Sequence, residues 1–367
     1  MTEFAGWDMP VRYTSDLAEH LAVRAAVGLF DLSHMGEIVV EGPGAGDALD
    51  FALVGWASGI EVGRARYSMI VAEDGGVIDD LVVYRTGPEC FLVVANAGNA
   101  AVVVTHVVER CGGFDCAVRD ESAETALIAV QGPRAAEVVA TMLEGHDRTR
   151  ALSLKYYASA PAAAVGAPVT VARTGYTGED GFEFFCPVGA AEALWDLSLV
   201  AGAAEGIVPC GLAARDTLRL EAGMPLYGHE LTRDRTPFEA GLGRVVAFGD
   251  ENEPRGDFVG RDALVRAAAR VARWESEPTA APDSAHVLVG LAGEGRRAAR
   301  AGYQVLGAAA PVGEVTSGAP SPSLGHPIAM AYVHPSVRGS GTDLDVDVRG
   351  RRERMTVCAL PFYHRSK

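Results

Sequence analysis

The sequence lacks the signatures of several common protein classes. Its six Cys include no CxxC pair, and only Cys111 and Cys116 lie close together, with no His at metal-ligand spacing. This usage predicts scattered, reduced thiols in a cytoplasmic protein, without a structural metal or disulfide. Residues 1–10 have no basic start and no apolar core, so we expect no secretory signal. Apolar runs such as 102–104 are far shorter than the roughly 20 residues of a membrane span, so no membrane association is expected.

The motifs of common nucleotide-binding and hydrolytic enzymes are also missing. The sequence has no GxxxxGK[ST] phosphate loop, no GxGxxG after a strand, no HExxH and no GxSxG. The Gly-rich stretch 175–181 precedes an expected strand, so it offers no helix N-terminus to a phosphate. A formal net charge of −16 argues against nucleic-acid binding, because such proteins neutralise phosphates with basic patches. The charge still permits a small anionic ligand held by a few Arg side chains.

What the sequence does contain predicts an α+β protein followed by a separate β domain. Its 49 % hydrophobic and 22 % charged residues are typical of a globular protein. No internal repeat is apparent. After an expected linker at 275–284, short alternating runs are separated by Gly, Pro and Ser, which predicts a small barrel or jelly roll. Before it, we expect helices at 15–27, 44–54, 98–110, 133–143, 189–200, 210–222 and 261–274, and strands at 36–40, 64–70, 77–84, 91–95, 126–130, 157–172 and 182–185.

Two adjacent carboxylates stand inside one of these strands. Asp74-Gly75 is a strong hairpin signal, and the β-branched run after it contains Asp79 and Asp80, although carboxylates are depleted in strands. Side chains alternate along a strand, so Asp80 and Tyr84 share one face with apolar neighbours while Asp79 points to the other. One interpretation is a polar group in a largely apolar pocket. The other is a pair of solvated carboxylates beside a turn.

Three further positions leave two interpretations open. Glu183 follows the Gly-rich loop that holds Tyr176, and it is either a solvated edge residue or a ligand acceptor. His34 is either a catalytic base or a packed, hydrogen-bonded histidine. Arg215 and Arg219 are one helical turn apart, and they either form a solvated face with Asp216 or serve a ligand.

Six stretches, taken together and in order, resemble the glycine cleavage system T-protein family of tetrahydrofolate-dependent aminomethyltransferases. They extend over nearly the whole chain. The stretches are 4–7, 23–37, 76–84, 175–183, 210–223 and 316–325.

The resemblance implies a fold, a reaction and partners. The fold would be an α+β three-lobed cloverleaf, with two interleaved lobes over 1–248, a linker and helix over 249–284, and a C-terminal β-barrel or jelly-roll domain over 285–367. The family takes an aminomethyl group from the lipoyl arm of H-protein, releases ammonia and leaves methylene-tetrahydrofolate. The expected partners are therefore lipoylated H-protein and folate, with no metal, nucleic acid or membrane.

The resemblance also assigns roles to individual residues. Asp80 corresponds to the catalytic carboxylate beside the reactive nitrogens of the folate, where it would stabilise positive charge as ammonia leaves. Glu183 and Arg215 correspond to the groups that hold the pterin ring, and Tyr363, or Arg365 nearby, would reach the folate tail. The remaining folate-binding positions line the cavity: Met35, Tyr67, Tyr84, Asn96 and Tyr176.

Three departures from the family pattern leave the one-carbon donor open. The chain is shorter than usual before Phe4, Arg244 replaces a usual Trp, and Thr232–Arg235 lacks the expected acidic run. A paralogous folate-dependent transferase that takes a methyl or one-carbon unit from another donor is therefore the alternative. A folate-binding factor in iron–sulfur maturation fits less well, because no Cys lies in the reactive segment which that branch carries. The acidic charge of the chain also means that any H-protein docking patch is local.

Overall fold

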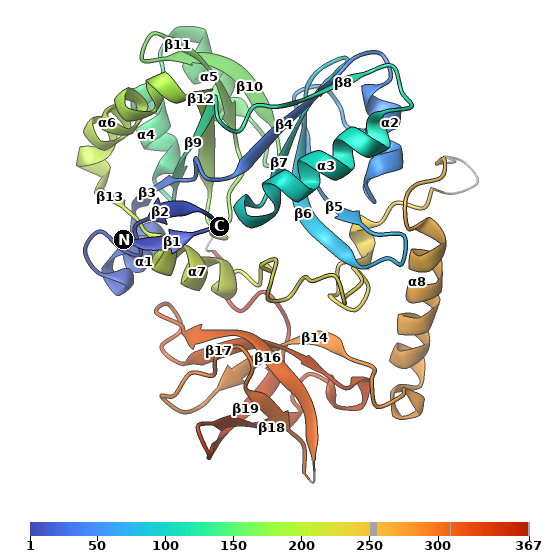
Figure 1. Ribbon diagram of the computed structural model, residues 1–367. Helices are drawn as coiled ribbons and strands as arrows, with labels where there is room; N and C mark the ends of the chain where they lie inside the picture. The colour runs from blue at the N-terminus through green and yellow to red at the C-terminus, as the bar shows by residue number, and fades with distance from the viewer. Residues whose placement is uncertain (250–254, 309, 366–367) are drawn as a thin grey trace. The chain divides into compact units, whose positions relative to one another are not determined.

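The computed structural model describes residues 1–249, 255–308 and 310–365 (Figure 1). The chain forms two compact units, and each takes segments from separate parts of the sequence. The first unit contains Met1–Ile70, Ile78–Arg215 and Ala247–Val259, and the second contains Val71–Val77, Asp216–Val246 and Gly260–Lys367. Within the expected linker and helix over 249–284, residues 250–254 lie outside the described chain. No helix of the described ranges is both long and apolar enough to cross a membrane.

The first unit contains a six-stranded sheet with the order β10-β11-β12-β9-β3-β13. All neighbours in it are antiparallel except β13, which runs parallel to β3. Figure 1 shows α4 and α6 side by side against this sheet, where they cover a core that includes Phe182 and Phe184. The elements are β3 (Val27–Asp31), β9 (Thr125–Gln131), α4 (Ala135–Met142), α5 (Gly145–Ser153), β10 (Ser159–Ala164), β11 (Ala167–Ala172), β12 (Gly181–Pro187), α6 (Ala191–Gly202) and β13 (Ile207–Pro209).

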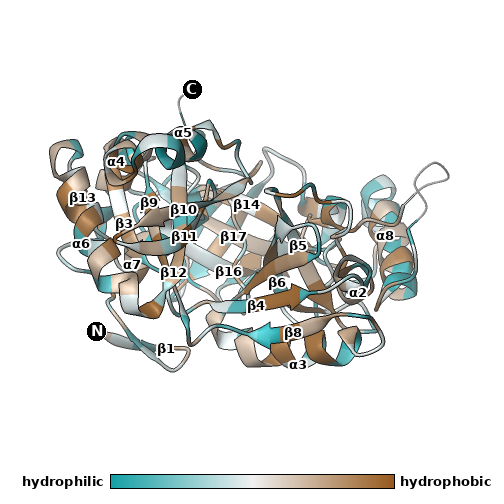
Figure 2. Ribbon diagram, turned by 90° about the horizontal axis from the view of Figure 1, so that it is seen from above, coloured by the Kyte–Doolittle hydropathy of each residue, from teal (hydrophilic) through white to brown (hydrophobic). Residues whose placement is uncertain are grey.

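A five-stranded sheet has the order β5-β6-β7-β4-β8, and α2 packs against α3 beside it. Hydrophobic residues run along β4 and β6 (Figure 2), and Ile38, Val40 and Val83 are buried. In the sequence this sheet interrupts the other, because β3 precedes its strands and β9 follows them. The expected pair of interleaved α+β lobes is therefore confirmed. The elements are β4 (Gly36–Glu41), α2 (Ala45–Ala52), β5 (Ala65–Val71), β6 (Val77–Gly87), β7 (Cys90–Ala95), α3 (Ala100–Cys111) and β8 (Ala117–Asp120).

A strand, a Gly-Pro turn and a helix occur twice in the structure, although the sequence shows no internal repeat. β4 leads through Gly42-Pro43 into α2, and β9 leads through Gly132-Pro133 into α4. Gly42 has φ +136° and Gly132 has φ +142°, and an added Cβ would lie 2.7 Å and 2.4 Å from the nearest backbone oxygen. Both turns therefore need glycine. The surrounding residues differ too much for the repeat to be apparent in the sequence.

The amino-terminal segment is tied to the start of α7 (Leu212–Glu221). It forms β1 (Thr2–Phe4), β2 (Trp7–Met9) and α1 (Asp16–Ala25), which Ser15 caps. The buried Glu19 carboxylate accepts the N–H groups of Tyr13 at 2.8 Å, Thr14 at 2.7 Å and Gly211 at 2.9 Å. One carboxylate therefore fixes both the segment before α1 and the residue that precedes α7.

The C-terminal strands close into a barrel in the order β14-β17-β16-β15-β18-β19. The structure thereby decides between the two expected β architectures, since closure leaves no free sheet edge. Small and branched side chains such as Leu291, Ala331 and Val346 fill the interior. The strands are β14 (Val287–Gly293), β15 (Gln304–Leu306), β16 (Pro311–Pro320), β17 (Pro327–Val333), β18 (Asp343–Val348) and β19 (Arg351–Cys358), and α8 (Arg261–Ser276) precedes them.

Arg219 on α7 is buried in the second unit, with 1 % of its surface exposed. Its guanidinium pairs with Asp216 at 2.8 Å, as the i, i+3 spacing predicts, and with buried Glu230 at 2.9 Å. It also donates to Ser317 Oγ on β16 at 2.9 Å. The expectation of a solvated face is therefore wrong for Arg219, because α7 packs that side of the helix against acidic and polar side chains.

Two local predictions also differ from the structure. The segment before Gly36 contains an additional strand, β3, whose buried run of apolar residues is too short for periodicity to assign. The helix expected from residue 133 begins only at Ala135, and Arg134 occupies its N-cap. Pro133 therefore belongs to the turn, which explains why it is tolerated there.

Candidate functional site

Strand β6 carries both adjacent carboxylates, and their surroundings differ. Asp79 is completely buried, whereas Asp80 on the opposite face is partly exposed. The alternative of two solvated carboxylates beside the turn is therefore wrong for Asp79. β6 lies between β5 and β7 in its sheet, so residues at the end of β7 reach the side chains of this strand.

Two asparagines surround the carboxyl of Asp79. The backbone N–H of Asn96 donates to Oδ2 at 3.0 Å, and its side-chain nitrogen donates to Oδ1 at 2.9 Å. Asn99 Nδ2 donates to the same Oδ1 at 3.1 Å. Burial, with the nearby charge of Asp80, raises the pKa of Asp79 to about 7, and the three hydrogen bonds oppose that rise.

Both carboxylate oxygens of Asp80 accept a hydrogen bond. The Tyr67 hydroxyl on β5 donates to Oδ2 at 2.9 Å, and Asn96 Nδ2 donates to Oδ1 at 2.8 Å. Burial, reinforced by Asp80, raises the pKa of Tyr67 well above its ordinary value, so the phenol stays protonated and donates. These bonds fix the orientation of the carboxylate, whose oxygens can only accept hydrogen bonds.

A second polar cluster lies around Glu183 on β12. The Tyr84 hydroxyl lies 3.0 Å from Thr174 Oγ1 and 3.3 Å from Glu183 Oε2, and the Thr174 hydroxyl donates to the same oxygen. Gln131 Nε2 holds the Thr174 carbonyl at 3.0 Å. Burial raises the pKa of Glu183, while these hydrogen bonds and the charge of Arg215 lower it. Glu183 is therefore a half-buried, hydrogen-bonded acceptor on an inner strand rather than a solvated edge residue.

Arg215 and Tyr176 form a stacked pair. The guanidinium carbon of Arg215, on the first turn of α7, lies 4.8 Å from the centre of the Tyr176 ring in the Gly-rich loop. Stacking of a guanidinium on an aromatic face stabilises the cation and favours one orientation of its plane.

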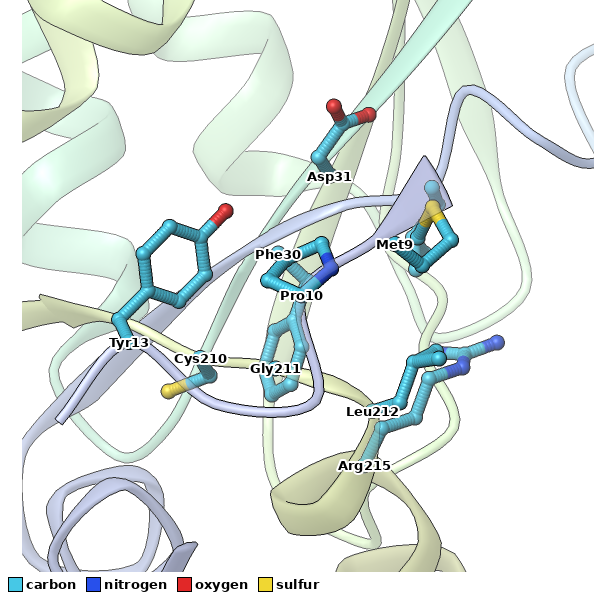
Figure 3. Close-up of a pocket in the computed structure, with 10 residues that line it drawn as sticks. Met9, Pro10, Tyr13, Phe30, Asp31, Cys210, Gly211, Leu212 and Arg215 are labelled. Atoms are coloured by element: carbon cyan, nitrogen blue, oxygen red, sulfur yellow. The ribbon is translucent and has the colours of Figure 1, made fainter. Parts of the chain in front are cut away.

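A small pocket in the first unit borders the stem of Arg215. Figure 3 shows the Arg215 side chain beside Leu212, extending away from Cys210 and Tyr13, so the charged end lies apart from these residues. Only Arg215 is shared with the polar clusters described above. The pocket is lined by Met9, Pro10, Tyr13, Phe30, Asp31, Leu32, Cys210, Gly211, Leu212 and Arg215.

His34 and Met35 precede β4. His34 is buried, its ring packs edge-to-face on Phe4 at 5.6 Å, and its Nδ1 has no hydrogen-bond partner among the described residues. Burial, with the charge of Arg215, lowers the pKa of His34 to about 4, so its ring is neutral at pH 7. This packing fits the interpretation of a packed histidine rather than a base. Met35 is partly exposed, and its N–H donates to the Leu32 carbonyl at 3.0 Å.

The structure brings most of the candidate residues into two neighbouring sets. Asp80 and Tyr84, four residues apart on one face of β6 as expected, each belong to one polar cluster. Tyr67 and Asn96 contact the first, and the charge of Arg215 acts on Glu183 in the second. Tyr363 lies in the other unit, where its N–H donates to the Glu221 carbonyl at 2.8 Å.

Sequence reasoning missed several residues that hold these clusters together: Asn99, Gln131 and Thr174. Their types are common in loops and carry no spacing signal, since their role depends on which strands lie side by side. The chemistry available is that of a fixed carboxylate, a half-buried carboxylate acceptor and a guanidinium donor. Among residues 1–249, 255–308 and 310–365, no group of three or more His, Cys, Asp or Glu could hold a metal ion.

Two family models match the chain in the order of its folded parts. The GCVT N-terminal domain matches residues 1–250, and the glycine cleavage T-protein C-terminal barrel domain matches residues 286–364. The chain belongs to the glycine cleavage T-protein family.

Members of the glycine cleavage T-protein family match the chain over its full length. It is 56 % identical to an aminomethyltransferase of Streptomyces avermitilis, covering 100 % of this chain and 94 % of the relative. An aminomethyltransferase of Cutibacterium acnes is 55 % identical, with 100 % and 95 % covered. The crystal structure of glycine cleavage system aminomethyltransferase T from Bartonella henselae has a TM-score of 0.87 at 37 % identity, covering 99 % of this chain and 94 % of that one.

Family membership and the full-length relatives support one enzymatic function. The chain is a transferase, the aminomethyltransferase of the glycine cleavage system. The expected alternative, a paralogue with another one-carbon donor, was motivated by Arg244, which lies in the short helix Gly243–Val245. The relatives described above do not favour that alternative.

Proposed function

We propose that this aminomethyltransferase moves the one-carbon unit from the aminomethyl-dihydrolipoyl arm of H-protein to tetrahydrofolate, with release of ammonia. The single observation that carries the proposal is the carboxylate of Asp80, fixed by Tyr67 and Asn96 on one face of β6. Tyr84 lies on the same face of β6 as Asp80, and its hydroxyl contacts Glu183 in the second cluster. This second cluster would supply the acceptor and donor groups that a pterin ring needs.

The residues of the second cluster fit a pterin ring. Glu183 is a half-buried acceptor beside the charge of Arg215, and a carboxylate suits the amino and N–H donors of the ring. Arg215 is a guanidinium held by Tyr176, and it suits the carbonyl oxygen of the ring. We therefore assign ring binding to this pair. Tyr176 lies beneath Arg215 and would hold it in that orientation.

Asp80 is the proposed catalytic residue. When bound, tetrahydrofolate supplies the nitrogens that accept the one-carbon unit. The partly exposed Asp80 carboxylate would accept a hydrogen bond from an N–H group of the folate. It would also stabilise the positive charge that develops as ammonia leaves. Because Tyr67 and Asn96 already hold both oxygens, little reorganisation is needed when that charge forms.

The remaining assignments are proposals of the same kind. Tyr67, Tyr84 and Asn96 would line the folate site together with Met35, whose partly exposed side chain precedes β4. The assignment of Tyr363 to the folate tail stays a prediction. We also propose the domain division 1–248, 249–284 and 285–367, with folate binding in the first part and no resident metal.

The lipoylated H-protein is the proposed macromolecular partner. With a net charge of −16, the whole chain does not attract an acidic carrier, so docking would rest on a local surface. H-protein carries the aminomethyl group on a long flexible arm. The reacting group could therefore reach the site even if H-protein contacts only a small surface of the enzyme.

The test is ammonia release from aminomethyl-loaded H-protein, with and without tetrahydrofolate. We expect release to be stimulated by tetrahydrofolate and to require the lipoyl arm. H-protein that lacks the lipoyl group serves as the matched control. Equal release with and without tetrahydrofolate, using H-protein from the same source, would contradict the proposal. In that case N-, S- and O-methyl compounds would be assayed as donors.

A further inference from the structure

One amide nitrogen lies between both carboxylates of β6. Asn96 Nδ2 is 2.9 Å from Asp79 Oδ1, 2.8 Å from Asp80 Oδ1 and 3.2 Å from the Asp80 carbonyl oxygen. All three neighbours are acceptors, and the oxygen of the same amide could form a hydrogen bond with none of them while they accept. The surroundings therefore require Asn96 to turn its nitrogen toward Asp80.

Asp79 determines the orientation of the Asn96 amide, because it accepts hydrogen bonds from both the backbone and the side chain of Asn96. It accepts the backbone N–H of Asn96 at 3.0 Å, which anchors that residue at the end of β7. It also accepts Asn99 Nδ2 at 3.1 Å, and that nitrogen is fixed in turn by the Ile78 carbonyl at 3.0 Å. Three N–H groups thus surround a carboxyl with 0 % exposure. Each of these three donors favours the ionised form of Asp79 and opposes the rise in pKa that burial causes.

The strand around Asp79 favours an apolar residue, so the hydrogen bonds to Asn96 and Asn99 are the reason for a carboxyl there. Asp79 lies inside a strand whose neighbours Ile78 and Leu81 are buried and apolar. A carboxyl costs free energy there unless it is hydrogen-bonded, and a branched apolar residue would suit the sheet better. It faces away from Asp80 and is inaccessible, so it touches no ligand on the Asp80 side.

We propose that Asp79 is a positioning residue for the aminomethyl transfer, because it holds the Asn96 amide with its nitrogen toward Asp80 and thereby directs the catalytic carboxylate. This inference rests on the proposed function of Asp80. The chain of contacts runs from Asp79 to Asn96 and from Asn96 to Asp80, and Tyr67 completes it on the other oxygen. Asp79 itself takes no part in binding the folate or the carrier.

The substitution Asp79→Asn separates this role from a packing role. It keeps the size and shape of the side chain but replaces one acceptor oxygen by an NH₂ group that faces N–H donors. The Asn96 side chain is the donor that can turn, and turning brings its oxygen toward Asp80. Asp80 then loses a hydrogen bond and gains a repulsive neighbour. We expect kcat to fall by roughly 10- to 100-fold, less than the roughly 10²- to 10³-fold that loss of a donor in direct contact with the reacting group costs, because Asn96 acts through Asp80.

The binding of tetrahydrofolate should change little in the same variant. Glu183 and Arg215, which we assign to the pterin ring, belong to the other polar cluster, where Glu183 contacts Tyr84 and Thr174 and Arg215 stacks on Tyr176. The dissociation constant measured by calorimetry is expected to stay within about 2-fold, because no group that binds the ring is lost. A loss of kcat without a change in affinity distinguishes a positioning role from general disruption of the unit.

Glu37→Gln is the matched control. Glu37 is another fully buried carboxyl in the same sheet, on β4, but none of its hydrogen bonds involves Asp80. It should retain the kcat of the wild type. If Asp79→Asn does not fold, Asn99→Ala replaces it, since this change removes one of the three donors to Asp79 and leaves Asn96 in place. It should lower kcat by about 3- to 10-fold, because the Asp79 side chain is then held by fewer hydrogen bonds and orients Asn96 less well.

Asn96 can also be observed directly. In protein labelled with ¹⁵N-asparagine, the side-chain NH₂ resonances of Asn96 should shift and lose protection from exchange in Asp79→Asn, and should be unchanged in Glu37→Gln. This readout needs no catalytic turnover. If the wild type shows no folate-stimulated release, the proposed function fails while this measurement still tests the position of Asn96. If the wild type is active and Asp79→Asn keeps full kcat, or its Asn96 resonances are unchanged, the role of Asp79 is overturned.

Discussion

At the scale of single residues, two neighbouring carboxylates differ because their strand alternates. Asp80 faces the site with a donor on each oxygen, and Asp79 is buried among three N–H groups. Period-2 alternation predicted which of them shares a face with Tyr84. It could not predict Asn96 and Asn99 as partners, because this contact depends on β7 lying beside β6.

Replacing Asp80 by Asn should separate catalysis from binding. The carboxamide keeps the shape of the side chain but carries no negative charge, so it stabilises developing positive charge poorly. We expect turnover to fall by roughly 10²-fold or more, with tetrahydrofolate affinity nearly intact. Steady-state ammonia release and calorimetry measure the two quantities. Asp74→Asn, in the exposed turn before β6, is the control. An unchanged rate for Asp80→Asn would remove Asp80 from the mechanism.

Glu183→Ala should weaken the binding of tetrahydrofolate. The pterin donors lose their acceptor, which costs roughly 1–3 kcal/mol of binding free energy. Calorimetric titration of the variant against Glu192→Ala, an exposed carboxylate on α6, measures the difference. Equal affinity in the two variants would be incompatible with the assignment of Glu183 to the pterin ring.

At the scale of elements, strand β4 carries an unusual buried carboxyl. Glu37 has 0 % exposure, and neither of its carboxyl oxygens has a hydrogen-bond partner in the described part of the chain. Burial, with the charge of Asp120, raises the pKa of Glu37 from 4.5 to about 9. The folded protein therefore keeps Glu37 protonated at neutral pH, whereas the unfolded chain ionises it.

This difference predicts how stability depends on pH. Between the ordinary pKa of 4.5 and the folded value of about 9, the folded state binds one proton more than the unfolded state, so Glu37 makes stability fall as pH rises. The contribution is up to about 1.4 kcal/mol per pH unit, and Glu37→Gln removes it. Hydrogen exchange of the β4 and β7 amides at pH 6, 7 and 8 compares the two proteins. Parallel pH dependences would show that Glu37 ionises normally.

On helix α7, two arginines that share one helical face have different surroundings. Arg215 and Arg219 are one turn apart, yet the first stacks on Tyr176 and the second is buried between Asp216 and Glu230. Helical spacing predicts that these side chains share a face, but it does not reveal what covers that face. Glu230 and Ser317, which complete the Arg219 site, lie outside the helix, 11 and 98 residues further along the chain.

Arg219→Ala should strongly destabilise the second unit. Removing one partner leaves buried Glu230 as an unpaired charge, which typically costs about 3–5 kcal/mol. Urea unfolding followed by hydrogen exchange of the barrel strands measures the loss. Arg12→Ala, which breaks an exposed i, i+4 pair, is the control and should leave stability unchanged. A similar stability for both variants would show that the buried pair contributes nothing.

At the scale of the whole molecule, the order of elements along the chain was the most predictable feature. Alternating strands and helices before residue 249, and Gly- and Pro-separated strands after 285, indicate the α+β part and the β domain from composition and periodicity alone. The interleaving of the two sheets was predicted only by resemblance. β3 joins β9 across nearly a hundred intervening residues, and no local pattern specifies such a contact.

The most direct test of the account follows the one-carbon unit itself. H-protein loaded with a ¹³C-labelled aminomethyl group is mixed with the enzyme and tetrahydrofolate in a single turnover, and the label and ammonia are measured together. The account predicts that the label moves to the folate at the rate at which ammonia is released, and that Asp80→Asn slows both equally. Label that leaves H-protein without reaching the folate, or ammonia release that is independent of folate, would contradict it.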